Sequence, residues 1–150
     1  MTPKQIERVK NKIKLIKSEL AKDKKVWGGQ YHDGRGIRYI PTSLYIQIGD
    51  ISGGLRYVNW FDKNFPDDIG SSFYIFESIL ILYKSTKTKE AELKLRNYKN
   101  ELEYILDLYF KKVVDKNFIY EFDNEELIEF SKWLKIITKR PESETHDKLE

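Results

Sequence analysis

The residues in this chain that come nearest to a catalytic group are His32 and Asp33, followed by Arg35 and Arg38. A histidine beside a carboxylate can act as a general base, and a nearby arginine can stabilise a phosphate. Adjacent residues of an extended segment point to opposite sides, however, so Asp33 is badly placed to orient His32. We therefore favour a turn with an exposed histidine and an exposed aspartate over an enzyme active site.

The sequence contains no residue pattern that is typical of another kind of catalytic site. The chain has no cysteine, which excludes disulfides, thiolate nucleophiles and thiolate metal ligands. A zinc site needs three or four ligands, and the second histidine, His146, is far from His32 in the sequence. There is no P-loop, dinucleotide fingerprint or nucleophile elbow. We expect a protein that is not an enzyme and holds neither a metal nor a cofactor.

Length and composition are typical of one charged globular domain. Of the 150 residues, 40% are hydrophobic and 34% are charged. No apolar run is long enough to cross a membrane, and the lysine-rich N-terminus lacks the apolar segment of a signal peptide, so we expect a cytoplasmic protein. The domain is expected to span residues 1–140, and the acidic segment 141–150, which has little to bury, is expected to be disordered.

Apolar residues at helical spacing predict an all-α fold that begins with a basic helix over residues 1–25. Thr2, Pro3 and Gln5 are typical of a helix start. One apolar stripe then follows at spacings of three and four, formed by Ile6, Val9, Ile13, Ile16 and Leu20. A glycine-rich loop is expected over residues 26–40. C-terminal helices are expected over 101–140, with an irregular stretch at 115–122 and a last, capping helix that begins at Asp123.

Between the loop and the C-terminal helices, residues 44–68 predict two short helices around a glycine turn. Tyr45, Gly49, Gly54 and Val58 follow one another at intervals of four, five and four, and Pro66 ends the unit. The same intervals recur in the next segment, at Leu82, Thr86, Ala91 and Leu95. Such an internal echo at fixed spacing is typical of repeat proteins.

This spacing resembles the tetratricopeptide repeat (TPR), a helix–turn–helix of about 34 residues whose copies stack side by side. The stretch also resembles uncharacterised bacterial proteins with degenerate repeats. The resemblance implies that residues 41–100 form two stacked hairpins, a short TPR-like array. Four positions depart from the family pattern. In the first copy, Phe61 stands where the family prefers alanine and Pro41 truncates the opening helix. In the second copy, Thr86 replaces the glycine and Glu103 stands in place of the closing proline.

The resemblance implies non-enzymatic protein binding, on a concave face lined by the first helix of each pair. A specific form of this hypothesis is a small bacterial immunity or inhibitor protein that occludes a toxin. Of the family's groove positions, we assign Ile46, Phe76 and Leu80 to the core. Trp60 lies one step off the buried stripe of Tyr57, Phe61 and Phe65 and is expected to reach the surface. The predicted partner-binding residues are Ser43, Gln47, Trp60, Glu77, Tyr83 and Lys84.

The alternative function is nucleic-acid binding through the N-terminal helix. Residues 1–25 carry nine lysines and arginines against three acidic residues. Such a helix attracts phosphate backbones through its field. Arginine, the preferred residue for reading bases, is scarce there, so we favour a solvated helix face.

Overall fold

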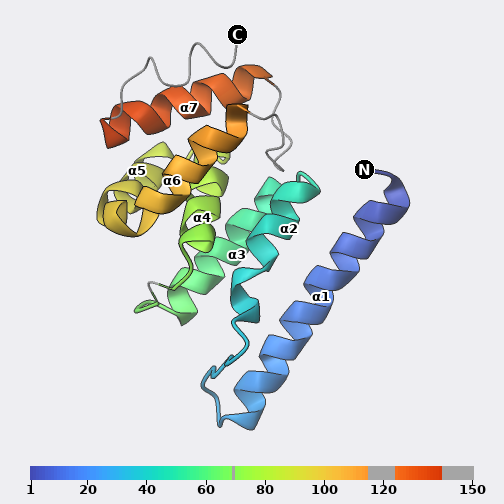
Figure 1. The fold of residues 1–150 in the computed structure, drawn as a ribbon. Coiled ribbons are helices and arrows are strands. Elements are labelled where there is room, and N and C mark those ends of the chain that lie inside the picture. The colour runs from blue at the N-terminus through green and yellow to red at the C-terminus, as the bar shows by residue number, and fades with distance from the viewer. Residues whose placement is uncertain (69, 115–123, 140–150) are drawn as a thin grey trace. The chain divides into compact units, whose positions relative to one another are not determined.

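The structure is a computed structural model that describes residues 1–68, 70–114 and 124–139. In these ranges it contains helices and turns but no strand, which confirms the all-α prediction for the described residues (Figure 1). The predicted irregular segment 115–122 and the acidic segment 141–150 lie outside them. The helices are α1 (Pro3–Val26), a 3-10 turn η1 (Ile37–Tyr39), α2 (Pro41–Gln47), α3 (Ile51–Asn64), α4 (Ser72–Lys84), α5 (Thr88–Asn97), α6 (Lys99–Val114) and α7 (Asn124–Thr138).

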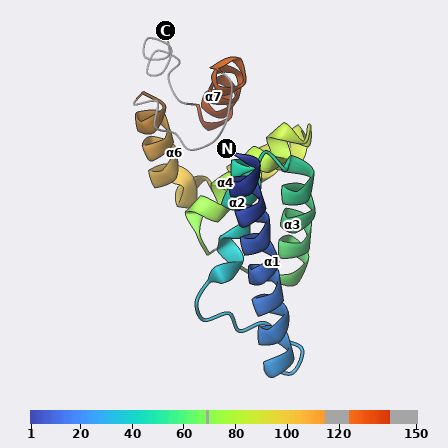
Figure 2. The ribbon, with the colours of Figure 1, turned by 90° about the vertical axis from the view of Figure 1, so that its right-hand side faces the viewer.

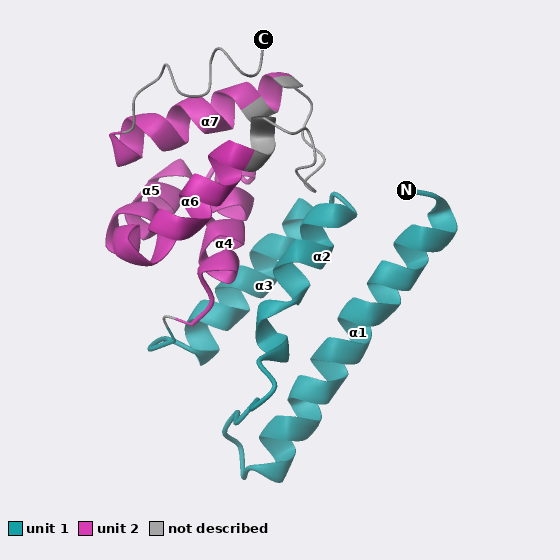
Figure 3. Cartoon of the chain, in the orientation of Figure 1, with its two compact units in different colours: residues 1–68 teal, residues 69–150 magenta. Residues whose placement is uncertain are grey.

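The chain divides into two compact units, residues 1–68 (unit 1) and residues 69–150 (unit 2), which Figure 3 shows in two colours. Unit 1 contains α1, η1, α2 and α3, and unit 2 contains the remaining helices. The division falls between the two hairpins that the sequence predicts within residues 41–100. Among the described residues, no helix combines the length and the apolar content that crossing a membrane requires.

Helix α1 begins at the predicted residues. The Thr2 hydroxyl accepts a hydrogen bond from the Gln5 backbone N–H at 3.2 Å, and the Gln5 side chain accepts one from the Thr2 N–H at 2.8 Å. Ile13, Ile16 and Leu20 are buried, whereas Ile6 and Val9 are only half-buried. α1 packs on α2 and η1, and α2 also packs on α3, so that α2 lies between the two longer helices (Figures 1 and 2).

The turn between α2 and α3 depends on Gly49. Its φ of 70° is a left-handed conformation that glycine adopts at little cost. This conformation lets the Asp50 N–H donate to the Tyr45 carbonyl at 2.9 Å, which closes the end of α2. The Asp50 carboxylate then caps α3 by accepting a hydrogen bond from the Gly53 N–H at 2.9 Å.

The turn between α4 and α5 repeats this backbone arrangement. Thr86, which the sequence echo pairs with Gly49, has a φ of 61°. The Lys87 N–H donates to the Leu82 carbonyl at 2.9 Å, as Asp50 does to Tyr45 in the first turn. The two turns therefore share one conformation at the positions that the echo aligns, although only the first has a glycine there.

Gly53 of α3 is a point of close approach between α2 and α3. A Cβ atom on Gly53 would overlap the capping carboxylate of Asp50 and would lie 2.7 Å from Cε1 of Tyr45, closer than real Cβ contacts allow. A Cβ on Gly49 would meet nothing within 4 Å, so Gly49 serves the turn and not the packing. Gly54 is buried in α3. A small residue is therefore needed at Gly53 for packing, whereas Gly49 is needed for its backbone conformation.

Gly53→Ala is therefore expected to destabilise unit 1 although alanine favours helix. Overpacking a filled site costs about 1–3 kcal/mol, because the buried Tyr45 ring must move. Urea unfolding followed by circular dichroism measures the loss. The matched control is Asn59→Ala, at an exposed position of α3, which should change stability by less than about 0.5 kcal/mol. Equal stability of Gly53→Ala and the wild type would contradict the close contact.

Unit 2 is built around α4, in which every residue from Tyr74 to Leu82 is buried. The Phe76 ring lies 5.3 Å from the Tyr109 ring of α6 and 6.2 Å from the Phe130 ring of α7. The Tyr109 hydroxyl is 2.8 Å from Oγ of Ser131. Phe130 is fully buried, as the predicted inward face of the last helix requires.

Candidate functional site

Asp33, half of the candidate catalytic pair, is a structural residue. It is 7% exposed, and its carboxylate accepts hydrogen bonds from the backbone N–H groups of Ile37 at 3.1 Å and Arg38 at 3.0 Å. His32 is exposed, and its ring lies 4.4 Å from that of Trp27. The interpretation as an exposed turn is right for His32 and wrong for Asp33, because the Asp33 carboxylate is enclosed by the turn that it caps.

Arg38 joins the loop to the end of α3. Its Nη1 lies 2.8 Å from Oδ2 of Asp33, and its Nε lies 2.8 Å from Oδ2 of Asp68. Its guanidinium carbon lies 4.4 Å from the centre of the Tyr39 ring, and the Tyr39 hydroxyl donates to Asp68 at 2.8 Å. Burial alone would lower the pKa of Arg38, but its hydrogen bonds to Asp33 and Asp68 raise it. We call Asp33, Arg38, Tyr39 and Asp68 the Arg38 clasp.

Asp23, near the end of α1, holds the other side of the loop. Its Oδ2 accepts hydrogen bonds from the N–H groups of His32 at 2.7 Å and Asp33 at 3.0 Å. These bonds fix the two residues that follow Tyr31. The Tyr31 ring meets Trp60 of α3 edge-on, with the centroids 5.6 Å apart. Asp23 and the Arg38 clasp therefore place Tyr31 against α3.

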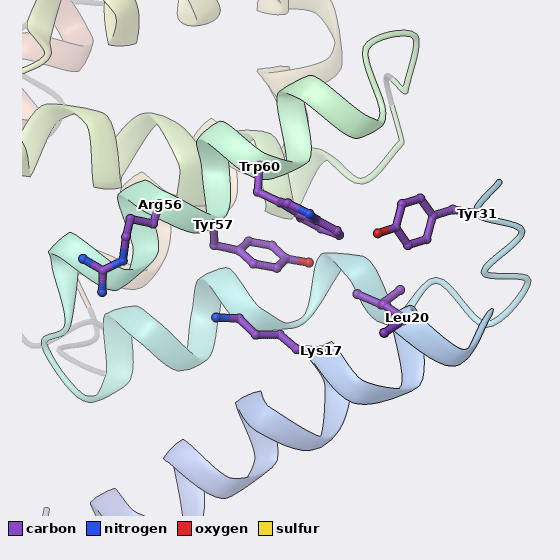
Figure 4. A pocket seen from close by; sticks show the side chains of 7 residues that line it. Lys17, Leu20, Tyr31, Arg56, Tyr57 and Trp60 are labelled. Atoms are coloured by element: carbon purple, nitrogen blue, oxygen red, sulfur yellow. The ribbon is translucent and has the colours of Figure 1, made fainter. Parts of the chain in front are cut away.

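A cavity with the form of a binding site lies between α1 and α3 in unit 1, and Tyr31 closes it at one end. It has a volume of about 400 Å³, within the range of ligand sites in proteins. Leu20, Tyr31, Tyr57 and Trp60 form its apolar and aromatic walls, and Lys17 and Arg56 contribute cationic side chains (Figure 4). We call these six residues the α1–α3 cavity.

The rings of the cavity are held in place by contacts with one another and with the loop. The Tyr57 hydroxyl donates to the Arg38 carbonyl at 2.6 Å, and the Tyr57 ring lies 5.3 Å from the Trp60 ring. Figure 4 shows the Tyr57 and Tyr31 hydroxyls directed toward each other across the cavity. The walls are therefore fixed before any partner arrives, which reduces the entropy cost of binding.

The charge of the cavity is positive. Burial raises the pKa of Tyr57, and burial together with the nearby Asp23 raises the pKa of Tyr31, so both hydroxyls stay neutral at physiological pH. Lys24 places its Nζ 5.2 Å from the centre of the Tyr31 ring, and Lys17 places its Nζ 5.5 Å from that of Tyr45. An apolar group with negative charge beside it matches this arrangement.

A second hollow, of about 370 Å³, lies beside the Arg38 clasp and is lined in part by His32, Asn64 and Asp67. It brings His32 near Arg38, as the catalytic hypothesis required. The guanidinium of Arg38, however, is bonded to Asp33 and Asp68. Its hydrogen-bonding capacity is used by the fold rather than directed to a substrate.

Three of the predicted partner-binding residues lie in unit 1. Trp60 is half-buried and lines the α1–α3 cavity, in agreement with its predicted access to the surface. Ser43 is half-buried and donates its hydroxyl to the Ile40 carbonyl at 3.0 Å, at the start of α2. Gln47 is half-buried at the end of α2. Neither Ser43 nor Gln47 lines the cavity.

The other three lie in unit 2, where the structure gives them internal contacts. Glu77 is only 4% exposed, so its carboxylate is not on the surface where the resemblance places partner contacts. The Tyr83 ring lies 5.0 Å from that of Phe130 and 5.0 Å from that of Trp133. Lys84 lies 3.6 Å from Glu126. The assignment of Ile46, Phe76 and Leu80 to the core is confirmed by exposures of 5%, 1% and 0%.

Trp60 is the one lining residue that the sequence predicted as a partner contact; the six that it missed are Lys17, Leu20, Ala21, Tyr31, Arg56 and Tyr57. Lys17 had a usable signal, because lysines recur at helical spacing beside the apolar stripe of α1. No sequence signal identifies Tyr31, because its position depends on hydrogen bonds that Asp23 accepts from His32 and Asp33, nine and ten residues further along the chain.

The pKa of Tyr57 leads to a pH prediction. Its folded-state pKa lies above the ordinary value of 10.0, so the unfolded chain ionises first as the pH rises. The folded chain then binds more protons than the unfolded chain, and stability falls with pH from about 10 upward. Urea unfolding at about pH 9 and about pH 11 should show a smaller loss for Tyr57→Phe than for the wild type. An equal loss in both proteins would contradict the protection of this hydroxyl.

Within the described ranges, no group of three or more histidine, aspartate or glutamate residues is arranged to hold a metal ion. No protein-family model matches the chain, and no curated protein or solved structure matches it at a significant level.

Proposed function

We propose that this chain is a non-enzymatic protein-binding module and that the α1–α3 cavity is its main contact site. The observation that carries the proposal is the cavity itself, with walls of Tyr31, Tyr57 and Trp60 and cations at Lys17 and Arg56. Tyrosine, tryptophan and arginine are the residues that most often dominate the energy of protein interfaces.

The residues nearest to a catalytic group support the same proposal. Asp33 and Arg38 bond to each other, and Asp33 also bonds to backbone groups, so both residues fix the conformation of the loop. A general base must instead reach the proton that it abstracts. The fold explains why charged residues stand at positions 33 and 38, so neither residue requires a catalytic role.

In its finer form, the proposal is that the α2–α3 and α4–α5 hairpins are two TPR-like units through which this chain binds its partner protein. The left-handed conformation that Gly49 and Thr86 share supports the equivalence of the two hairpins as copies of one repeat. Small size and the absence of a recognisable catalytic motif suit an immunity or inhibitor protein that covers the surface of a bacterial toxin. We offer that role as the biological form of the binding function.

The proposal is tested by retention of proteins from a cell extract on the immobilised full chain. The wild type is compared with Trp60→Ala, which removes a cavity wall, and with Trp27→Ala, a matched tryptophan outside the cavity that is 55% exposed. We expect a protein that the wild type and Trp27→Ala retain and Trp60→Ala loses. Retention of the same proteins by all three chains would overturn the cavity as the contact site.

Nucleic-acid binding through α1 is the second candidate, favoured by the exposure of every lysine in that helix. It predicts affinity for RNA or DNA that falls steeply between about 50 mM and about 200 mM salt. It also predicts that a chain without residues 1–25 loses this affinity. Tight nucleic-acid retention together with no retained protein would favour this candidate over the first.

A further inference from the structure

We infer that the partner contacts this chain through an acidic segment that inserts one apolar or aromatic side chain into the α1–α3 cavity. The inference rests on the proposed function and adds the chemistry of the partner. It combines three features of unit 1. They are a row of lysines along α1, the lack of an ion pair between that row and any carboxylate among the described residues, and the form of the cavity.

The lysine row consists of Lys10, Lys14, Lys17 and Lys24, all exposed. Spacings of four, three and seven residues place them on one face of α1. At 1.5 Å per residue the row is about 21 Å long. Lys17 and Ala21, which occupies the position between Lys17 and Lys24 on the same face, both line the cavity. The cationic face therefore runs past the cavity and extends well beyond it.

The charges of this row are available to a partner. Within the part of the chain that the structure describes, none of the four lysines lies within ion-pair distance of a carboxylate, and the same holds for Arg56. Glu19 of α1 lies 3.6 Å from both Lys22 and Arg35, away from the lysine row. A segment with several carboxylates would complement the row, and such complementarity sets specificity and speeds association.

The form of the cavity favours a protein segment over a nucleic acid. A single-stranded nucleic acid is held by successive bases that stack on separate aromatic platforms. Here Tyr31 meets Trp60 edge-on at 83°, and Trp60 and Tyr57 lie 5.3 Å apart, so the rings enclose one cavity of about 400 Å³. One anchoring side chain fits this arrangement, with carboxylates of the same segment along the lysine row.

The test uses the full chain with Trp27→Phe and Trp133→Phe, in which Trp60 is the single remaining tryptophan. The first probe is a short peptide of aspartate and glutamate with a central Leu-Phe pair. Comparison probes are the same peptide with Ala-Ala at the centre, the peptide with lysine in place of every acidic residue, and a uridine oligonucleotide. We expect a saturable change in Trp60 emission with the first probe alone.

Charge reversal then locates the segment on α1. The Lys14→Glu, Lys17→Glu double variant should weaken the binding of the first probe at least about tenfold, because two attractive charges become repulsive. The matched control is Lys12→Glu, Lys22→Glu, which changes two exposed lysines outside the row and should stay within about twofold. Equal weakening by both double variants would overturn the placement along the row.

The outcomes separate this inference from the proposed function. If no acidic peptide binds while Trp60→Ala still releases a protein from the extract, the inference is overturned and the proposed function stands. If the oligonucleotide binds more tightly than the first peptide, or the lysine-containing peptide binds equally well, the inference is also overturned. If Trp60→Ala releases no protein and no acidic peptide binds, both fall.

Discussion

Replacing Arg38 with alanine is expected to lower the free energy of unfolding of unit 1 by about 3 kcal/mol. The side chain of Asp33 is 3% exposed and that of Asp68 is 14% exposed, and both carboxylates pair with Arg38 at 2.8 Å. Removal of the guanidinium leaves two carboxylates close together without their cation in a poorly hydrated place. The loop would then lose the side-chain link between Arg38 and Asp68, which lies in the segment that follows α3.

Urea unfolding in a Trp133→Phe background measures this loss, because the remaining tryptophans, Trp27 and Trp60, both lie in unit 1. Arg35→Ala is the matched control. Arg35 belongs to the same loop, but its side chain is 72% exposed and lies 3.6 Å from Glu19. Such exposed pairs contribute at most about 1 kcal/mol. Similar losses in the two variants would show that the Arg38 clasp does not stabilise the loop.

Phe61→Ala is expected to destabilise unit 1 by about 3–5 kcal/mol. Phe61 is 1% exposed, and its ring lies 5.0 Å from that of Phe65, 6.0 Å from that of Tyr39 and 6.5 Å from that of Tyr57. The TPR pattern prefers alanine here, so the substitution restores the family residue. In this chain it would open a cavity beneath the aromatic cluster instead.

The same urea experiment measures the effect, with Leu15→Ala as a control because Leu15 lies in unit 1 and is 60% exposed. The control should change stability by less than about 1 kcal/mol. A Phe61→Ala chain as stable as the wild type would mean that α3 packs as the family alanine allows. The aromatic core described for unit 1 would then be wrong.

The helices were largely predictable because their signals are local. The start of α1 is predicted by Thr2, Pro3 and Gln5, because hydrogen bonds between Thr2 and Gln5, three residues apart, cap the helix. The turn at Gly49 was likewise legible, since few residues other than glycine adopt its φ readily. Thr86 adopts nearly the same φ without that signal, and only its spacing from neighbouring apolar residues revealed the equivalence.

The site was much less predictable, because it depends on contacts between distant segments. Asp33 stands in a sequence that is typical of a surface turn. Its burial depends on the ion pair with Arg38, which no local sequence pattern predicts. Glu77 has a polar side chain at a helix position that the family uses for contacts, yet it lies in the core. Trp60 was identified because its offset from the stripe of Tyr57 and Phe61 is a property of one helix alone.

The most direct measurement is photocrosslinking from a position within the cavity to the protein that the immobilised chain retains from the cell extract. A photoreactive phenylalanine derivative is placed at the position of Arg56 in one chain and at the position of Lys12, on α1 outside the lysine row, in another. We predict a covalent adduct with the partner from position 56 and none from position 12. Adducts from position 12 with none from position 56 would contradict the α1–α3 cavity as the binding site.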